Sequence, residues 1–432
     1  MDELSLEYSP FEDELDDAVD FYEIVPCADQ LIDSVIGSTF HLLVAALASK
    51  FVREVVKGPK TLQVLFNLAI TTFILSRQYS KVANFGHILA LFLTLLLSSY
   101  SLLRFNSQKF APYVAVISTL LILQGCIGTE NFLSIRGSLM IFGMRFITAH
   151  HLLGQKKRCL DILTYLTDPV TLVFGPYLTF DEYFSKRTEG SFSRVLRHLR
   201  LLLLSFGCLV LSTCFADVVP IYSDFFDDWL TAFSFRFSHY FVGFLSQALL
   251  VLVSIDVAVV DVTSVEFPRS VVDIVAAWDV PMHKFLHTYV FKESRNRLGP
   301  RDAILFTFFV SATLHGYDTQ IALVLLTLGY ISYVESEVRR QLAAKLSACV
   351  ECRPCTGCSH DYKKNHILTL TVNFVFRILA FLHLLYTGMI FTNDHGPTGY
   401  PLVHTFEKWR QYSFASHLIT VTMHFCIYPL ER

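Results

Sequence analysis

The chain has 432 residues, of which 53% are hydrophobic and only 17% charged, and its mean hydropathy is +0.46. Soluble domains usually contain about 25% charged residues and about 45–50% apolar ones. The composition therefore excludes a large soluble enzyme and predicts one all-α polytopic membrane protein, because helices satisfy their own backbone hydrogen bonds in lipid.

The N-terminal segment is strongly acidic. The first 23 residues include ten Asp and Glu, and no Lys or Arg occurs before Lys50. Such a run of like charges is typical of a solvated or disordered tail. We therefore expect residues 1–26 to be a tail and residues 27–432 to form one membrane domain. The tail lacks the basic and apolar regions of a cleavable signal peptide, so insertion is expected to depend on the first internal span.

Apolar segments of spanning or half-spanning length recur along the chain, and they predict about eleven crossings or half-crossings. They lie at 33–52, 61–76, 83–103, 111–126, 137–153, 162–181, 198–219, 229–260, 303–314, 317–334, 367–392 and 411–430. The sequence Phe174-Gly175-Pro176 interrupts one of them. It predicts a kinked or re-entrant piece, which membranes tolerate only where protein covers the freed backbone groups.

Charge indicates which loops face the cytosol. Between Arg200 and Arg236 there is no Lys or Arg, whereas four Asp residues occupy the intervening loop. Cytosolic loops carry an excess of basic residues, so this loop is expected on the non-cytosolic side. The basic segments at 284–301 and 339–364 are expected in the cytosol.

A single histidine stands within the apolar stretch from 302 to 335. The 12 residues from Ala303 to Leu314 would form a helix of roughly 18 Å, which places His315 near the middle of the bilayer. Residues 316–318 then form a break before a second apolar run. An ionisable group at this depth predicts a functional site.

Two other interpretations of the histidines remain open. His315 could only form a hydrogen bond between helices. Haem ligation by two histidines is a weaker alternative, because the other candidates show no interpretable spacing. Those candidates are His150, His151, His239, His417 and His424.

A second candidate group precedes this stretch. Trp278, Asp279 and Pro281 stand at a predicted helix start, where Asp279 would cap the helix and Trp278 would lie at the membrane interface. Alternatively, Asp279 and His315 face each other across a cavity, with the carboxyl group orienting the substrate or the imidazole.

The basic residues between 292 and 301 directly precede the half-span that leads to His315. They can anchor the chain at the cytosolic face, or they can bind the phosphates of a nucleotide-bearing donor such as coenzyme A. The two interpretations are compatible, and Arg295 and Arg301 are the candidates for donor binding.

Cys349, Cys352, Cys355 and Cys358 are spaced every third residue. Cytosolic thiols stay reduced, which disfavours a structural disulfide if the loop is cytosolic. Four thiolates can bind zinc, but uniform spacing would strain a tetrahedral site. Zinc, lipidation, a disulfide in a lumenal loop and no special role all remain open.

The sequence WDVPMHKFLHTYVFK at 278–292, followed by SATLHG at 311–316, resembles the membrane-bound O-acyltransferase family. The family motif is W-[ND]-x-x-x-x-x-[WF]-L-x-x-Y-[VI], with a later histidine in an apolar helix. The segments 234–248, 265–281, 347–360 and 414–417 are similar to the branch of the family that acylates Wnt proteins. That branch usually has Asn where this chain has Asp279, although other members have Asp. A buried carboxyl group must be protonated or paired.

The resemblance implies about eleven helices around a central tunnel. It implies transfer of a palmitoleoyl group from acyl-CoA to a serine hydroxyl of Wnt proteins, in a multi-pass protein of the endoplasmic reticulum membrane. His315 would be the catalytic base, Asp279 would position the carbonyl or the imidazole, and Trp278 and Ser311 would line the donor site.

The expected partners are acyl-CoA, Wnt proteins and the lipid membrane, with no nucleic acid, no metal among the site residues and no cofactor beyond the acyl-CoA co-substrate. An acyltransferase for a lipid or for another protein, and a non-catalytic Wnt-binding chaperone, are the alternatives.

Overall fold

The computed structural model describes residues 21–54, 59–106, 110–173, 175–185, 191–215, 218–219, 223–355, 357–392 and 399–431. These residues are almost entirely helical, and the one β contact among them is an isolated bridge between Ala348 and Tyr362. The prediction of an all-α architecture is confirmed. Residues 1–20 of the expected acidic tail lie outside the described residues, and residues 21–26 form the start of the first helix rather than a tail.

The elements, in chain order, are α1 (Phe21–Glu54), α2 (Lys60–Gln78), α3 (Phe85–Asn106), α4 (Ala111–Ile127), α5 (Thr129–Gly154), α6 (Cys159–Leu166), α7 (Phe180–Phe184), α8 (Ser191–Val210), the π-helix η1 (Leu211–Phe215), α10 (Asp224–Leu252), α11 (Val262–Glu266), α12 (Val271–Trp278), α13 (Val280–Phe285), the π-helix η2 (Leu286–Phe291), α14 (Lys292–Leu314), α15 (Thr319–Leu346), α16 (Ile367–Gly388), α17 (Leu402–Gln411) and α18 (Ala415–Glu431).

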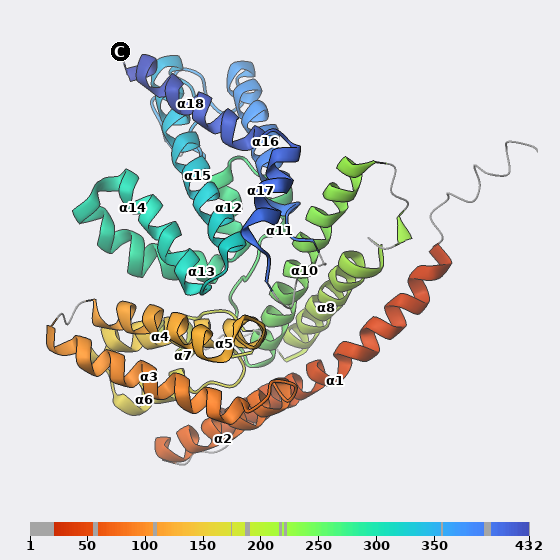
Figure 1. The fold of residues 1–432 in the computed structure, drawn as a ribbon, viewed down its shortest axis with the longest axis vertical. Helices are drawn as coiled ribbons and strands as arrows, with labels where there is room; N and C mark the ends of the chain where they lie inside the picture. Colours follow the sequence, from red (N-terminus) through yellow and green to blue (C-terminus); the bar gives the residue numbers. More distant parts are fainter. Residues whose placement is uncertain are drawn as a thin grey trace, which may run out of the picture.

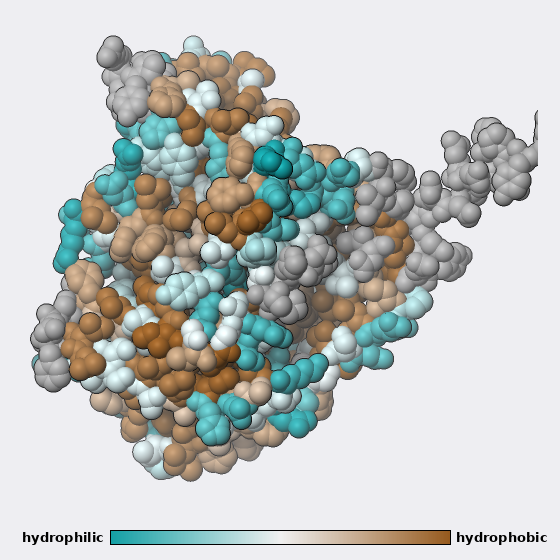
Figure 2. All heavy atoms as spheres, in the orientation of Figure 1, coloured by the Kyte–Doolittle hydropathy of each residue, from teal (hydrophilic) through white to brown (hydrophobic). Residues whose placement is uncertain are grey.

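Seven of the described helices are long and apolar enough to cross a membrane by length and composition, and α4 is apolar but shorter. They are Ile24–Val52, Phe85–Arg104, Thr129–Gly154, Phe192–Phe215, Asp224–Leu252, Thr319–Leu346 and Ile367–Gly388. Large apolar side chains such as Leu65, Leu102 and Phe374 are exposed on the outside of this bundle. Figure 2 shows hydrophobic residues over much of the visible surface, as expected for a lipid-facing protein.

The helices are arranged in connected groups (Figure 1). In the view shown, α1 and α2 run along the lower edge, α3, α4 and α5 lie together above them, and α14, α15, α16 and α18 occupy the upper part. Helix α10 packs along α8 and also contacts α16. Two apolar clusters hold these groups together: one joins α3, α4, α5, η2 and α14, and the other joins α10, α12, α15 and α16.

The apolar segment at 162–181 is interrupted, as the Phe174-Gly175-Pro176 sequence predicted. Helix α6 ends at Leu166 and is followed by a buried non-helical stretch up to α7. Asp168, only 1% exposed, accepts hydrogen bonds from the Thr171 backbone and hydroxyl, at 3.3 and 2.9 Å. A Cβ atom on Gly175 would lie 2.0 Å from the Thr171 Cα, so the chain can turn here only with glycine. The predicted break is confirmed, although Phe174 itself lies outside the described residues.

A disulfide between Cys27 and Cys214 joins α1 to η1. No pattern in the sequence predicts it, because the two cysteines are 187 residues apart. Cys214 directly precedes the loop without Lys or Arg that is expected on the non-cytosolic side. An oxidising compartment on that side agrees with a disulfide there.

Candidate active site

His315 lies at the turn between α14 and α15. Helix α14 ends at Leu314, and the His315 backbone N–H donates to the Ala312 carbonyl at 3.1 Å. Gly316 follows with φ of +79°, and α15 begins at Thr319. The expectation that two helical segments meet at this histidine is confirmed.

The turn is held by side chains of α4 and α5. The Gln124 amide oxygen accepts from the Tyr317 backbone N–H at 2.5 Å, and its amide nitrogen donates to the Tyr317 carbonyl at 3.3 Å. Asp318 caps α15 by accepting from the Ile321 N–H at 3.0 Å, and it forms an ion pair with Arg136 at 2.7 Å. Arg136 and Asp318 are also the charged groups that interact electrostatically with His315.

Asp279 is the residue between α12 and α13. One carboxylate oxygen accepts from the Met282 backbone N–H at 2.9 Å, and Pro281 occupies the first turn of α13. The predicted cap is therefore present. Helix α13 then continues into η2, which contains the second half of the W-[ND] motif. Short π-helical segments are frequent at functional sites, because the extra residue redirects side chains.

Aromatic rings fix the backbone directly before Asp279. The His239 ring stacks on Trp278 with centroids 4.4 Å apart, and its Nε2–H donates to the Trp278 carbonyl at 2.7 Å. Phe235 stacks on Trp278 at 5.7 Å, and Phe391 stacks on Phe235 at 4.0 Å. His239 also lies close enough to interact electrostatically with Asp279.

His239 is therefore a residue of this site that the sequence argument considered only as a haem alternative. The available signal was its place in the segment 234–248, which resembles the family, but a stacking contact cannot be read from spacing.

Asp279 and His315 have neighbours in one common apolar cluster. Leu314 belongs to the cluster of α3, α4, α5, η2 and α14, and Met282 packs against it. On the other side of Asp279, Trp278 packs against the cluster of α10, α12, α15 and α16. Among the described hydrogen bonds, none joins Asp279 to His315, and each is held by neighbours of its own. Their cooperation across a cavity stays a prediction.

The remaining candidates occupy two environments. Ser311 is 5% exposed and lies four residues before His315, hence on the same side of α14. Arg295 and Arg301 are exposed and stand on either side of a break at Gly299, where φ is +81°. The Arg301 guanidinium lies over the Tyr333 ring, 5.3 Å from its centre. The two arginines are thus available at the surface, before the buried end of the helix.

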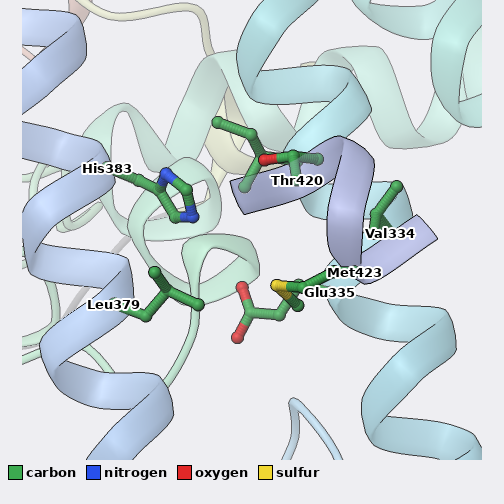
Figure 3. A pocket seen from close by; sticks show the side chains of 7 residues that line it. Val334, Glu335, Leu379, His383, Thr420 and Met423 are labelled. Carbon is green, nitrogen blue, oxygen red and sulfur yellow. The ribbon is translucent and has the colours of Figure 1, made fainter. Parts of the chain in front are cut away.

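A small pocket between α15, α16 and α18 is separate from this site (Figure 3). His383, Glu335 and Met423 point into it from the three helices. Glu335 is 16 residues beyond the start of α15 at Thr319, a distance of about 24 Å along a helix. The Glu335 carboxylate accepts from the Val271 N–H at 2.8 Å and pairs with Arg339 at 3.3 Å, so it has a structural role.

The other histidines considered for haem have protein partners. His150, His151, His417 and His424 share hydrogen bonds with the hydroxyls of Tyr100, Tyr113, Tyr386 and Tyr330, at 2.8, 3.0, 2.9 and 2.8 Å. Hydrogen bonding of this kind between helices stabilises membrane bundles. It gives each of these four side chains a polar partner on another helix.

Residues 82–346 match the model of the MBOAT, membrane-bound O-acyltransferase family. This region contains the W-[ND] motif, His315 and the turn that holds it. The chain belongs to this family, and it is a multi-pass membrane acyltransferase.

Several curated relatives carry one name. The chain is 30% identical over 439 residues to the protein-serine O-palmitoleoyltransferase porcupine of Caenorhabditis briggsae, an alignment that covers 94% of this chain and 96% of the relative. It is 34% identical over 365 residues to the protein of the same name from Homo sapiens, covering 73% and 78% of the two chains. The Mus musculus protein of that name gives the same identity and coverage.

Proposed function

We propose that this chain transfers a palmitoleoyl group from acyl-CoA to a serine hydroxyl of Wnt proteins, at the endoplasmic reticulum membrane. The observation that carries the proposal is the likeness along nearly the full length of the Caenorhabditis briggsae relative, which is named for serine palmitoleoylation. Family membership and the His315 turn support the acyl transfer itself.

In this proposal His315 removes the proton from the acceptor serine as the serine oxygen attacks the thioester carbonyl. The C–S bond then breaks, and the proton passes from the imidazole to the departing CoA thiolate. General base catalysis is typically worth about a hundred- to ten-thousand-fold in rate. The histidine ends a helix at a turn held by α4 and α5, which gives the imidazole a defined position.

Asp279, Trp278 and Ser311 complete the proposed site. The His239–Trp278 stack fixes the backbone at Asp279, so the aspartate can orient the thioester carbonyl. Ser311 shares a side of α14 with His315 and would lie beside the acyl donor. The donor itself reaches the site from the cytosol, and the serine acceptor from the lumen, so neither polar substrate has to cross the bilayer.

Arg295 and Arg301 are proposed to bind the phosphates of the donor. Replacing both by Ala should raise the KM for palmitoleoyl-CoA about tenfold or more and leave kcat nearly unchanged, because phosphate contacts far from the reacting carbonyl contribute uniform binding. Initial-rate measurements on the purified protein test this. Arg340→Ala is the matched control, since Arg340 is an exposed arginine paired with Glu337 on α15. An unchanged KM in the double variant would contradict this assignment.

Acceptor choice is tested with labelled palmitoleoyl-CoA and the purified protein. A Wnt peptide with its acceptor serine, the same peptide with alanine, and a lysophospholipid are offered in parallel. We expect label only on the serine peptide. Label on the lysophospholipid alone would show a lipid acyltransferase, and peptide binding without thioester turnover would show a non-catalytic carrier; either result would refute the proposal.

A further inference from the structure

We propose that Cys349, Cys355, Cys358 and His360 bind one structural zinc ion, in the loop between α15 and α16. One ligand atom from each residue, three sulfurs and one imidazole nitrogen, lies within 4.8 Å of all the others. The loop follows Leu346, the last residue of α15, and belongs to the basic region expected in the cytosol.

The distances among these atoms fit a shared metal better than any direct bond. The His360 Nδ1 lies 3.7 Å from the Cys349 sulfur and 3.8 Å from the Cys355 sulfur. A tetrahedral zinc with bonds of about 2.3 Å to sulfur and about 2.0 Å to nitrogen holds such atoms about 3.5 Å apart. Cys349 and Cys358 sulfurs are 3.0 Å apart, which is too long for a disulfide of about 2.05 Å. They must separate by about 0.8 Å to share a zinc ion.

The ligand chemistry selects zinc. Three thiolates and one imidazole form a soft donor set, which disfavours Mg²⁺ and Ca²⁺ and is common in closed structural zinc sites. Reduced cytosolic thiols are available for a metal rather than for disulfides. The complex would carry a net charge of −1, and Arg353 and Lys363 in the same loop can balance it; the Lys363 ammonium already donates to the Cys358 carbonyl at 2.6 Å.

The structure also resolves the difficulty raised by uniform cysteine spacing. Cys352 is not part of the cluster, because its sulfur lies 3.7 Å from the Ser336 hydroxyl on α15. His360 takes the fourth position instead. Gly357, with φ of +72°, and the bridge between Ala348 and Tyr362 fold the two ends of the loop together. The resulting ligand spacing is C-x5-C-x2-C-x-H.

The loop is anchored where it meets the helices. Arg339, fully buried, donates to the carbonyls of Val350 at 2.7 Å and Glu351 at 3.1 Å. Arg269 donates to the Cys349 carbonyl at 2.9 Å, two residues before α12 begins at Val271. Zinc binding would therefore stabilise the loop and the start of the helix that leads to Asp279, but it would contribute nothing to the chemistry.

Metal content tests the proposal without reference to activity. The protein is purified in detergent without chelators or a metal-affinity step, and zinc is measured by mass spectrometry. We expect about one zinc per chain for the wild type and for the control Cys352→Ser, and less than a fifth of that for Cys358→Ser and His360→Ala. Wild-type protein without zinc, or loss of zinc from Cys352→Ser alone, would overturn the proposal.

A second measurement needs only wild-type protein, so it tests the proposal even if the variants fail to fold. Wild-type protein is treated with a zinc chelator and then with a maleimide, and modified peptides are counted by mass spectrometry. Cys349, Cys355 and Cys358 should become reactive only after chelation. Equal labelling with and without chelator, or recovery of a Cys349–Cys358 disulfide from freshly purified protein, would show that no zinc is bound there.

Discussion

The Asp279 side chain combines a structural and a chemical role that substitution can separate. Its carboxylate caps α13 through the Met282 N–H, and the same residue stands where the family motif allows either Asn or Asp. The amide oxygen of an Asn side chain can accept the same hydrogen bond and so cap the helix equally well. The cap requires an oxygen acceptor, whereas the charge is required only if the carboxylate orients a substrate as an anion.

Asp279→Asn should therefore retain the fold and at least a tenth of the wild-type acyl transfer, whereas Asp279→Ala should lose transfer almost completely. The alanine variant should also lose about 1 kcal/mol of stability, the usual effect of removing a helix cap. Parallel turnover and thermal-unfolding measurements on the two purified variants check this. Full activity of Asp279→Ala would show that Asp279 has no role in acyl transfer.

For single residues, the sequence predicts local features such as helix caps and breaks well, but it predicts poorly which distant side chains contact them. The cap by Asp279 follows from the position of Pro281, and the break after Leu314 follows from the length of the apolar run; both signals are local. The His239–Trp278 stack and the Gln124 contacts to the turn depend on residues 39 and 193 positions apart. Local periodicity carries no information about such pairs.

At the scale of elements, the turn from α14 to α15 determines where His315 lies. Gly316 has φ of +79°, and a Cβ there would lie 2.4 Å from the Gln124 amide oxygen and 2.6 Å from the Phe132 ring. Both the backbone conformation and the close approach to α4 and α5 require glycine.

Gly316→Ala should lower stability by about 1–3 kcal/mol and reduce acyl transfer by more than tenfold, because the turn has to move and carry the histidine with it. Gly125→Ala is the control, since Gly125 is a helical glycine on α4, next to Gln124, with open space around its Cβ position. Thermal unfolding and turnover of both variants decide the matter. A Gly316→Ala protein that behaves like the control would show that the turn is not constraining.

At the scale of the whole molecule, two cysteine sites are expected on opposite faces of the membrane. The Cys27–Cys214 disulfide adjoins the acidic loop between Arg200 and Arg236. The cluster of Cys349, Cys355, Cys358 and His360 lies within the basic segment at 339–364. The charge pattern and the redox chemistry of the two compartments thus favour the same topology.

This topology is testable because the natural sequence contains no Asn-x-Ser/Thr sequon. Glu3→Asn creates one in the N-terminal segment, ahead of Cys27, and Ile367→Thr creates one at Asn365, after the cysteine loop. We expect N-glycosylation of the first variant only, seen as an endoglycosidase-sensitive mobility shift. Glycosylation at Asn365 instead would show that the topology is the reverse of the one expected.

Much of the fold was predictable because lipid imposes a strong constraint on sequence. Helices α3, α4, α5, α10, α15 and α16 appear close to the expected apolar segments, since each must satisfy its backbone internally over bilayer length. At 162–181 the sequence predicted a kinked or re-entrant piece, but its burial between α6 and α7 was not predictable, because hydropathy cannot distinguish lipid contact from burial in protein. A hydrogen bond from the Thr171 hydroxyl to the buried Asp168 carboxylate stabilises that stretch without a helix.

The most direct measurement is single-turnover transfer of labelled palmitoleoyl from CoA to a Wnt serine peptide by purified wild-type and His315→Ala protein. His424→Ala is the control, since His424 bonds Tyr330 away from the α14–α15 turn. We expect His315→Ala to unfold at the wild-type temperature, to bind palmitoleoyl-CoA, and to transfer at least a hundredfold more slowly. His424→Ala should transfer within a few-fold of wild type. Near-normal transfer by folded His315→Ala protein would contradict the assignment of His315 as the catalytic base.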